Sequence, residues 1–275
     1  MTSPRRLIES PPRPGVAGTG IIIIAVILLS IVPFSLKISI WVVAISLLLV
    51  AAAVFSRETQ SLHLSLFTAA LIVSPYLLPS LRTWPYALLI PILCYGAGVL
   101  MVPGLRRSIL WLRIGRFGKD VVFLVAAVAA ISGLALYAWY SALKPDLAIQ
   151  LGHMPAMPVW LFPMAGLAFA IGNAAMEEFA FRGVIMQALD SAAGPGIVSI
   201  LIQAWLFGAM HFLQGFPNGG WGLVMTIVYG VMLGETRRRS QGMLASWAAH
   251  VCADLVIFAI LSGVVLPHST LKCNK

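Results

Sequence analysis

Residues 158–176 read PVWLFPMAGLAFAIGNAAM, nineteen residues without a charge, and residues 177–183 then read EEFAFRG. The first segment has the length and apolar character of a membrane-spanning helix. The second segment places Glu177, Glu178 and Arg182 directly against it. Ionisable groups at membrane depth are energetically costly and usually face a cavity or one another. We therefore predict a membrane helix that carries a functional polar cluster.

The composition of the whole chain is that of an integral membrane protein. Of its 275 residues, 60% are hydrophobic and only 10% are charged, and the mean hydropathy is +0.96. A soluble domain of this length needs a more polar surface. The apolar runs are continuous rather than alternating, which favours helices as the spanning elements.

Nine apolar segments approach or reach the length that a helix needs to cross a bilayer. We predict an all-α fold, a polytopic transmembrane helical bundle of eight or nine spans. The segments that contain Pro33, Pro75 and Pro91 fit least well, because proline interrupts helical hydrogen bonding. The candidate spans are 17–35, 39–55, 62–80, 85–103, 120–142, 158–189, 195–213, 219–236 and 241–265.

The net charge of +9 comes mainly from lysine and arginine in the loops. This distribution is typical of the positive-inside rule, so we infer membrane lipid as a partner and no nucleic acid. We expect a plasma-membrane protein with a cytoplasmic N-terminus. The apolar run from Ile21 has no convincing cleavage site after it and is expected to remain as the first span. With nine spans, all three basic clusters fall on one side, which would be the cytoplasm. The clusters are Arg5, Arg6 and Arg13; Arg106, Arg107, Arg113, Arg116 and Lys119; and Arg237, Arg238 and Arg239.

Five ionisable residues fall inside or against apolar sequence, all of them in the second half of the chain. Glu178 and Arg182 are four residues apart, in the order that favours a helical ion pair, so Arg182 is expected to neutralise Glu178. Glu177 points about 100° away around the helix and has no partner within it. Its carboxylate is therefore available as a general base. The five residues are Glu177, Glu178, His211, His250 and Asp254.

The two histidines occur on two further helices. Phe207 and His211 are four residues apart in LFGAMHF, and His250 and Asp254 are four apart in HVCAD, so each pair shares a helix face. Counted from the turn SAAGPG, Glu177 and His211 lie at a similar depth, roughly 22–25 Å. His250 lies only about 15 Å from the arginine cluster, so either its helix tilts or the predicted helix boundaries are wrong.

Three motifs in this order resemble those of a known family. EEFAFR matches EExxxR, FGAMH matches FxxxH, and HVCAD matches HxxxN/D. Their order and spacing are similar to those of the CPBP family of intramembrane proteases. That family includes CAAX prenyl endopeptidases and bacterial proteins of bacteriocin processing or immunity. The resemblance covers about residues 155–265.

The resemblance implies an intramembrane endopeptidase that cleaves a peptide or protein near a lipidated or hydrophobic C-terminus, prenylated substrates included. By position, Glu177 would activate the water and His211 would help to hold or deprotonate it. His250 and Asp254 would complete the site and stabilise the oxyanion. Many relatives have asparagine where this chain has Asp254. An ionised carboxylate cannot donate a hydrogen bond, so Asp254 is either protonated or has a different role. The supporting residues are Glu178, Arg182 and Phe207.

The composition along the chain and the extent of the resemblance together predict a division of the chain. Residues 1–20 are expected to form a flexible cytoplasmic tail and residues 21–150 a set of N-terminal transmembrane helices without a recognisable motif. Residues 151–266 are expected to form the catalytic helical domain, followed by a C-terminal tail at 267–275.

The sequence leaves the use of a metal open. One alternative is a divalent ion such as zinc, held by Glu177, His211, His250 and Asp254 as a histidine–carboxylate set. The HExxH motif, a strong signal for zinc, does not occur in the sequence. The other alternative, which we favour, is a metal-free reaction with a glutamate base and an imidazole partner.

Two other functions are compatible with the same residues. A proton-coupled transporter also uses buried Glu, His and Asp. Such a transporter would have two pseudo-symmetric halves, whereas the buried ionisable residues here all lie in the second half of the chain. A non-catalytic membrane scaffold or bacteriocin-immunity protein could carry the same site, and the sequence does not separate it from an enzyme.

Overall fold

The computed structural model describes residues 11–152, 154 and 157–270. Every regular element in this part of the chain is a helix, which confirms the all-α prediction. Most of the two predicted tails, residues 1–10 and 271–275, lies outside the described residues. The first helix begins at Val16 and the last continues to Thr270, so helix extends into both segments predicted as tails.

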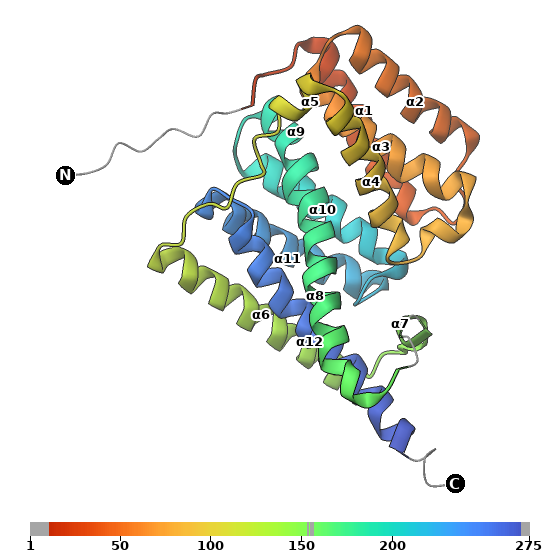
Figure 1. Cartoon of the computed structure of the whole chain (residues 1–275), viewed down its shortest axis with the longest axis vertical. Coiled ribbons are helices and arrows are strands. Elements are labelled where there is room, and N and C mark those ends of the chain that lie inside the picture. Colours follow the sequence, from red (N-terminus) through yellow and green to blue (C-terminus); the bar gives the residue numbers. More distant parts are fainter. Residues whose placement is uncertain (1–10, 153, 155–156, 271–275) are drawn as a thin grey trace, which may run out of the picture.

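The first half of the chain forms a group of helices packed around α3, which contacts α1, α2 and α4. Figure 1 shows this group, in red to yellow, on one side of the longer helices. Its members are α1 (Val16–Ile31), η1 (Val32–Phe34), α2 (Ile40–Phe55), α3 (Thr59–Leu77), η2 (Pro79–Arg82), α4 (Tyr86–Met101) and α5 (Pro103–Arg107).

The second half carries the three motifs on α8, α10 and α12. α12 packs against α8, and α10 packs against α11. α6 packs against α11 and α12, so it belongs with the motif helices rather than with the N-terminal group predicted for residues 21–150. The elements are α6 (Lys119–Leu143), α7 (Ala148–Gly152), η3 (Val159–Leu161), α8 (Phe162–Glu178), η4 (Phe179–Ile185), α9 (Met186–Ala193), α10 (Ile197–Gln214), α11 (Gly219–Ser240) and α12 (Leu244–Thr270).

Several of these helices can cross a membrane. Within the described residues, four have sufficient length and hydropathy, and three shorter helices are also apolar. This confirms a polytopic membrane bundle but not the predicted eight or nine spans, because α3 and α11 are in neither group. α3 contains polar residues at 60, 61 and 63, and α11 ends in the arginine cluster. The four long spans are Val16–Phe34, Lys119–Leu143, Val159–Ala193 and Leu244–Val264, and the shorter helices are Ile40–Phe55, Tyr86–Met101 and Ile197–Leu213.

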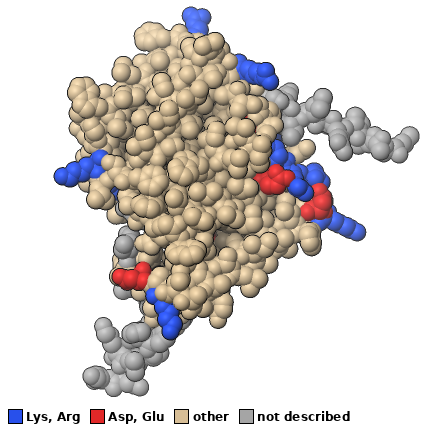
Figure 2. All heavy atoms as spheres, turned by 180° about the vertical axis from the view of Figure 1, so that it is seen from behind, with Lys and Arg blue, Asp and Glu red and all other residues tan. Residues whose placement is uncertain are grey.

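The outer surface of the bundle is apolar. Large hydrophobic side chains such as Leu48, Phe55, Phe123 and Trp160 are exposed. Figure 2 shows a broad face without charge, with the lysines, arginines and acidic residues gathered at its rims. Soluble monomers rarely expose apolar surface on this scale, so these faces suit contact with lipid.

Two of the basic clusters lie at the same end of the bundle. The segment before α6 pairs with the turn between α11 and α12: the Arg116 backbone N–H donates to the Ser240 carbonyl at 2.7 Å, and the Met243 N–H donates to the Arg113 carbonyl at 2.8 Å. The contact between these two segments agrees with the prediction that both basic clusters lie on the same side of the membrane. The cytoplasmic orientation of that side stays a prediction.

Glycine allows α10 and α11 to approach closely. A Cβ at Gly208 would lie 2.5 Å from Ile227 Cγ1 and 2.7 Å from the Leu223 carbonyl oxygen. Neither contact is tolerable without separation of the helices, because real Cβ atoms do not approach other atoms so closely. Gly208 therefore brings Phe207 and His211, its neighbours on α10, close to α11.

We expect Gly208→Ala to lower the free energy of unfolding by about 1–3 kcal/mol, the usual cost of overpacking. The measurement is thermal unfolding of the purified protein in detergent. Gly220→Ala is the matched control, because a Cβ at Gly220 on α11 meets no atom within 4 Å. Equal melting temperatures for the two variants would contradict this account of the α10–α11 packing.

Candidate active site

Arg182 is the buried cation around which the site is built. It lies on η4, a short π-helical stretch that continues α8, and its side chain is 0% exposed. Arg182 Nη1 lies 3.1 Å from Glu178 Oε1, so the predicted ion pair is present. The guanidinium carbon lies 4.5 Å from the centre of the Phe207 ring, a cation–π contact. Nη2 also donates to the Gly230 carbonyl at 3.4 Å. Arg182 thereby ties α10 and α11 to the end of α8.

His250 on α12 lies between the carboxylates of α8. Its Nδ1 is 3.0 Å from Glu178 Oε1, and its Nε2 is 3.3 Å from Glu177 Oε2. Nε2 is also 3.9 Å from Asp254 Oδ1, one turn further along the same helix. Glu178 is thus shared between Arg182 and His250, whereas the sequence predicted only the arginine. Glu177, which has no charged partner on its own helix, finds one on α12.

The arrangement has consequences for charge. Both ring nitrogens of His250 face carboxylates, and an imidazole donates from both nitrogens only as a cation. As a cation, His250 joins Arg182 in offsetting the three carboxylates of Glu177, Glu178 and Asp254. All five side chains are buried. Buried charges persist when they are paired in this way, since an isolated one would be very costly.

Asn173 is a site residue that the sequence reasoning missed. It lies on α8 one turn before Glu177, and its Nδ2 donates to Glu177 Oε1 at 3.2 Å and to Asp254 Oδ2 at 3.1 Å. Its Oδ1 accepts a hydrogen bond from the indole N–H of Trp84 at 2.8 Å. The available signal was the single asparagine in the 158–176 run, four residues before a site glutamate.

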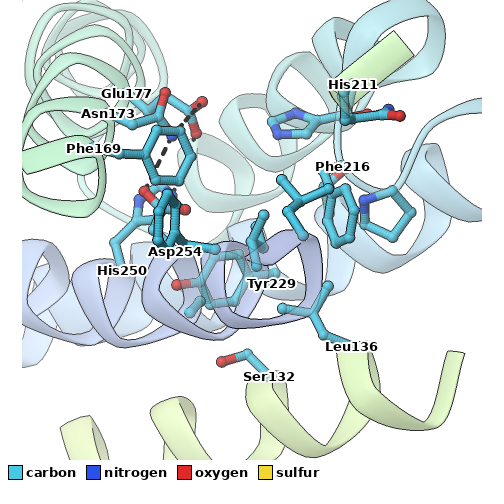
Figure 3. A pocket seen from close by; sticks show the side chains of 18 of the residues that line it. Ser132, Leu136, Phe169, Asn173, Glu177, His211, Phe216, Tyr229, His250 and Asp254 are labelled. Carbon is cyan, nitrogen blue, oxygen red and sulfur yellow. Dashed lines mark hydrogen bonds and ion pairs between the residues drawn. The ribbon is translucent and has the colours of Figure 1, made fainter. Parts of the chain in front are cut away.

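His211 faces the other residues from α10. Its Nδ1 lies 2.9 Å from the Phe207 carbonyl oxygen, which can only accept, so Nδ1 carries a hydrogen and donates it. In the neutral ring, Nε2 is then a hydrogen-bond acceptor. Figure 3 shows the His211 ring across the pocket from Glu177, Asn173 and Asp254 and directed toward them.

One cavity of about 670 Å³ joins these groups. The cavity is lined by Glu177, His211, His250 and Asp254. Glu178 and Arg182 are not part of its lining. The rest of the lining is mostly apolar and comes mainly from α6, α8, α11 and α12, with further residues from α10 and from segments between helices. Its larger members include Leu136, Phe162, Phe169, Met225, Phe216 and Phe258. The cavity therefore combines a small ionisable face with space for apolar groups.

The side chains as placed do not fit a metal ion. Among the described residues, no group of three or more His, Cys, Asp or Glu side chains converges as a metal site requires. Both nitrogens of His250 are directed at carboxylates, and His211 lies on the opposite side of the cavity. We therefore assign no reaction step to a metal.

Comparison with known proteins identifies the segment that contains the site. Residues 158–256 match a family model described as type II CAAX prenyl endopeptidase Rce1-like. All three motifs fall within these residues, and the match confirms the resemblance to the CPBP family. No curated protein and no solved structure matches the chain.

The buried ion pair makes a stability prediction. We expect Arg182→Met to lower the free energy of unfolding by about 3–5 kcal/mol, because the change leaves buried carboxylates without their cation. Arg239→Met is the control: Arg239 forms the same four-residue pair with Glu235, but the side chains are 61% and 39% exposed. Such a surface pair contributes at most about 1 kcal/mol. Thermal unfolding in detergent makes the comparison, and similar losses for both variants would contradict a structural role for Arg182.

Proposed function

We propose, from the match of residues 158–256 to the type II CAAX prenyl endopeptidase Rce1-like family model, that this protein is an intramembrane endopeptidase. Its substrate would be a peptide or protein cleaved near a lipidated or hydrophobic C-terminus, with prenylated substrates included. The observation that carries the proposal is the placement of Glu177 and His211 on facing sides of one largely apolar cavity. Hydrolysis of an amide needs a base, a held water and charge stabilisation, and this cavity offers groups for all three.

Glu177 is the proposed general base. Its carboxylate lines the cavity, where Oε2 lies 3.3 Å from His250 Nε2 and Oε1 accepts from Asn173 at 3.2 Å. Each carboxylate oxygen has two lone pairs, so a water in the cavity can donate to the Glu177 carboxylate. His211 Nε2, an acceptor in the neutral ring, would take the second hydrogen bond and aim the water oxygen at the substrate carbonyl.

The proposed reaction has two proton transfers. The water oxygen attacks the carbonyl carbon while its proton passes to Glu177, and a tetrahedral oxyanion forms. The positive charge of His250 in the cavity wall stabilises the oxyanion. Glu177 then returns the proton to the amide nitrogen as the carbon–nitrogen bond breaks. The products are a new carboxyl terminus and a free amine.

Asp254 has a different part in this proposal from the one implied by the resemblance. A carboxylate cannot donate a hydrogen bond to an oxyanion. Asp254 instead accepts from Asn173 and lies 3.9 Å from His250 Nε2. We assign it to holding these two side chains, with the oxyanion stabilised by the histidine charge.

We expect Glu177→Gln to lower kcat by about 10²–10⁴-fold, because glutamine cannot accept the water proton. The assay uses protein in lipid nanodiscs with fluorogenic peptides, one prenylated and one carrying an unmodified apolar C-terminus. Glu235→Gln, a change at a partly exposed residue outside the cavity, should leave kcat unchanged. Full activity of Glu177→Gln would overturn the assignment of the base.

The same preparation separates the two other functions. A transporter predicts proton flux into liposomes that depends on Glu177 and no peptide cleavage. A scaffold or immunity protein predicts neither flux nor cleavage by the wild-type protein.

The metal question has its own test. We expect activity to survive dialysis against a strong zinc chelator, because the side chains do not form a converging donor set in the described residues. Metal content would be measured on the same sample, and we expect less than one equivalent of zinc. Loss of cleavage on chelation with recovery on added zinc would contradict the metal-free mechanism.

A further inference from the structure

Trp84 connects the N-terminal helices to the site. It lies between η2 and α4, in the half of the chain without motifs, and it lines the cavity. We propose that Trp84 and Asn173 form a positioning pair that sets the orientation of the Glu177 and Asp254 carboxylates. This inference rests on the proposed function, and it gives the N-terminal half of the chain a defined part in catalysis.

The hydrogen bond from Trp84 fixes which way the Asn173 amide faces. An indole N–H can only donate, so the atom it meets at 2.8 Å must be the amide oxygen of Asn173. The amide nitrogen then faces the opposite way, toward α12, with two hydrogens to donate. One goes to Glu177 Oε1 at 3.2 Å and the other to Asp254 Oδ2 at 3.1 Å. Figure 3 shows Asn173 beside Glu177 and above Asp254.

The Glu177 and Asp254 carboxylates need a shared hydrogen-bond donor such as the Asn173 amide because they repel each other. Both approach the same nitrogen of His250, at 3.3 Å for Glu177 and 3.9 Å for Asp254. Like charges that share a site disfavour each other, and a donor to each of them offsets that cost. With Oε1 held by Asn173 and Oε2 beside His250 Nε2, the Glu177 carboxylate has one fixed orientation at the cavity wall. Small displacements of a catalytic group strongly reduce the reaction rate. The hydrogen bonds from Asn173 therefore affect kcat.

Trp84 can be tested without removing its packing. Its ring also makes an edge contact with Phe169, with ring centres 5.4 Å apart, and phenylalanine retains that contact. Trp84 is 40% exposed, and the change takes the indole donor from Asn173 Oδ1, on a residue that lines the cavity. Trp84→Phe therefore removes one hydrogen bond and keeps an aromatic ring at the cavity wall.

The first experiment is a double-mutant cycle of Trp84→Phe and Asn173→Ala in the peptide assay. We expect each single variant to lower kcat by about tenfold or more with KM within about twofold. The double variant should be no slower than Asn173→Ala, because the tryptophan acts only through the asparagine. Additive losses, or a change confined to KM, would overturn the proposal.

Trp247→Phe is the matched control. Its indole N–H also donates to α8, at 3.2 Å to the backbone carbonyl of Ile171, but Trp247 does not line the cavity. We expect kcat and KM of this variant to equal those of the wild-type protein. A loss equal to that of Trp84→Phe would mean that any indole bond to α8 has the same effect, and the proposal would fail.

The second experiment does not depend on turnover. The indole N–H signal of Trp84 is assigned in a nitrogen–proton correlation spectrum by its loss in Trp84→Phe. Asn173→Ala should move this signal upfield, because the hydrogen bond is lost, while Trp247→Phe leaves it in place. An unmoved signal would overturn the proposed pair. If the signal moves but the wild-type protein cleaves no peptide, the proposed protease function fails and the structural pair stands.

Discussion

The Glu178–Arg182 ion pair is the interaction on which the rest of the site depends. Arg182 is fully buried, and its contacts with Phe207 and Gly230 hold α10 and α11 against the end of α8. Glu178 extends the pair to His250, which brings α12 to the same point. One buried cation thus joins the helices that carry all three motifs. A cation at this depth is tolerable only with its partners, so the charge specifies a single arrangement of those helices.

The adjacent glutamates have separate tasks as a result. Glu178 faces the interior and holds two cations, whereas Glu177 lines the cavity. The separation comes from their 100° offset around the helix axis. Asp254 adds a third carboxylate to the site, and Asn173 supplies an amide from a neighbouring helix. An amide donor and carboxylates are therefore both present.

Much of this arrangement could be predicted from residue spacing. The four-residue interval predicted the Glu178–Arg182 pair, and helix rise predicted that Glu177 and His211 would reach one depth. In Figure 1, α12 runs obliquely to α8, and the tilt of the His250 helix relative to a bilayer stays a prediction. Spacing could not predict the bond between Trp84 and Asn173, which are 89 residues apart. It also missed the sharing of Glu178 with His250 and the packing of α6 against the motif helices, because both are tertiary contacts between distant segments.

The account's central claim is that a water-filled cavity inside the bilayer is shared by side chains of α8, α10 and α12. The most direct measurement is a high-resolution experimental structure in lipid nanodiscs that resolves ordered water. We predict a water bound to the Glu177 carboxylate and to Nε2 of His211, with His250 against both glutamates. A Glu177 side chain turned toward lipid, or a cavity without water between Glu177 and His211, would contradict the claim.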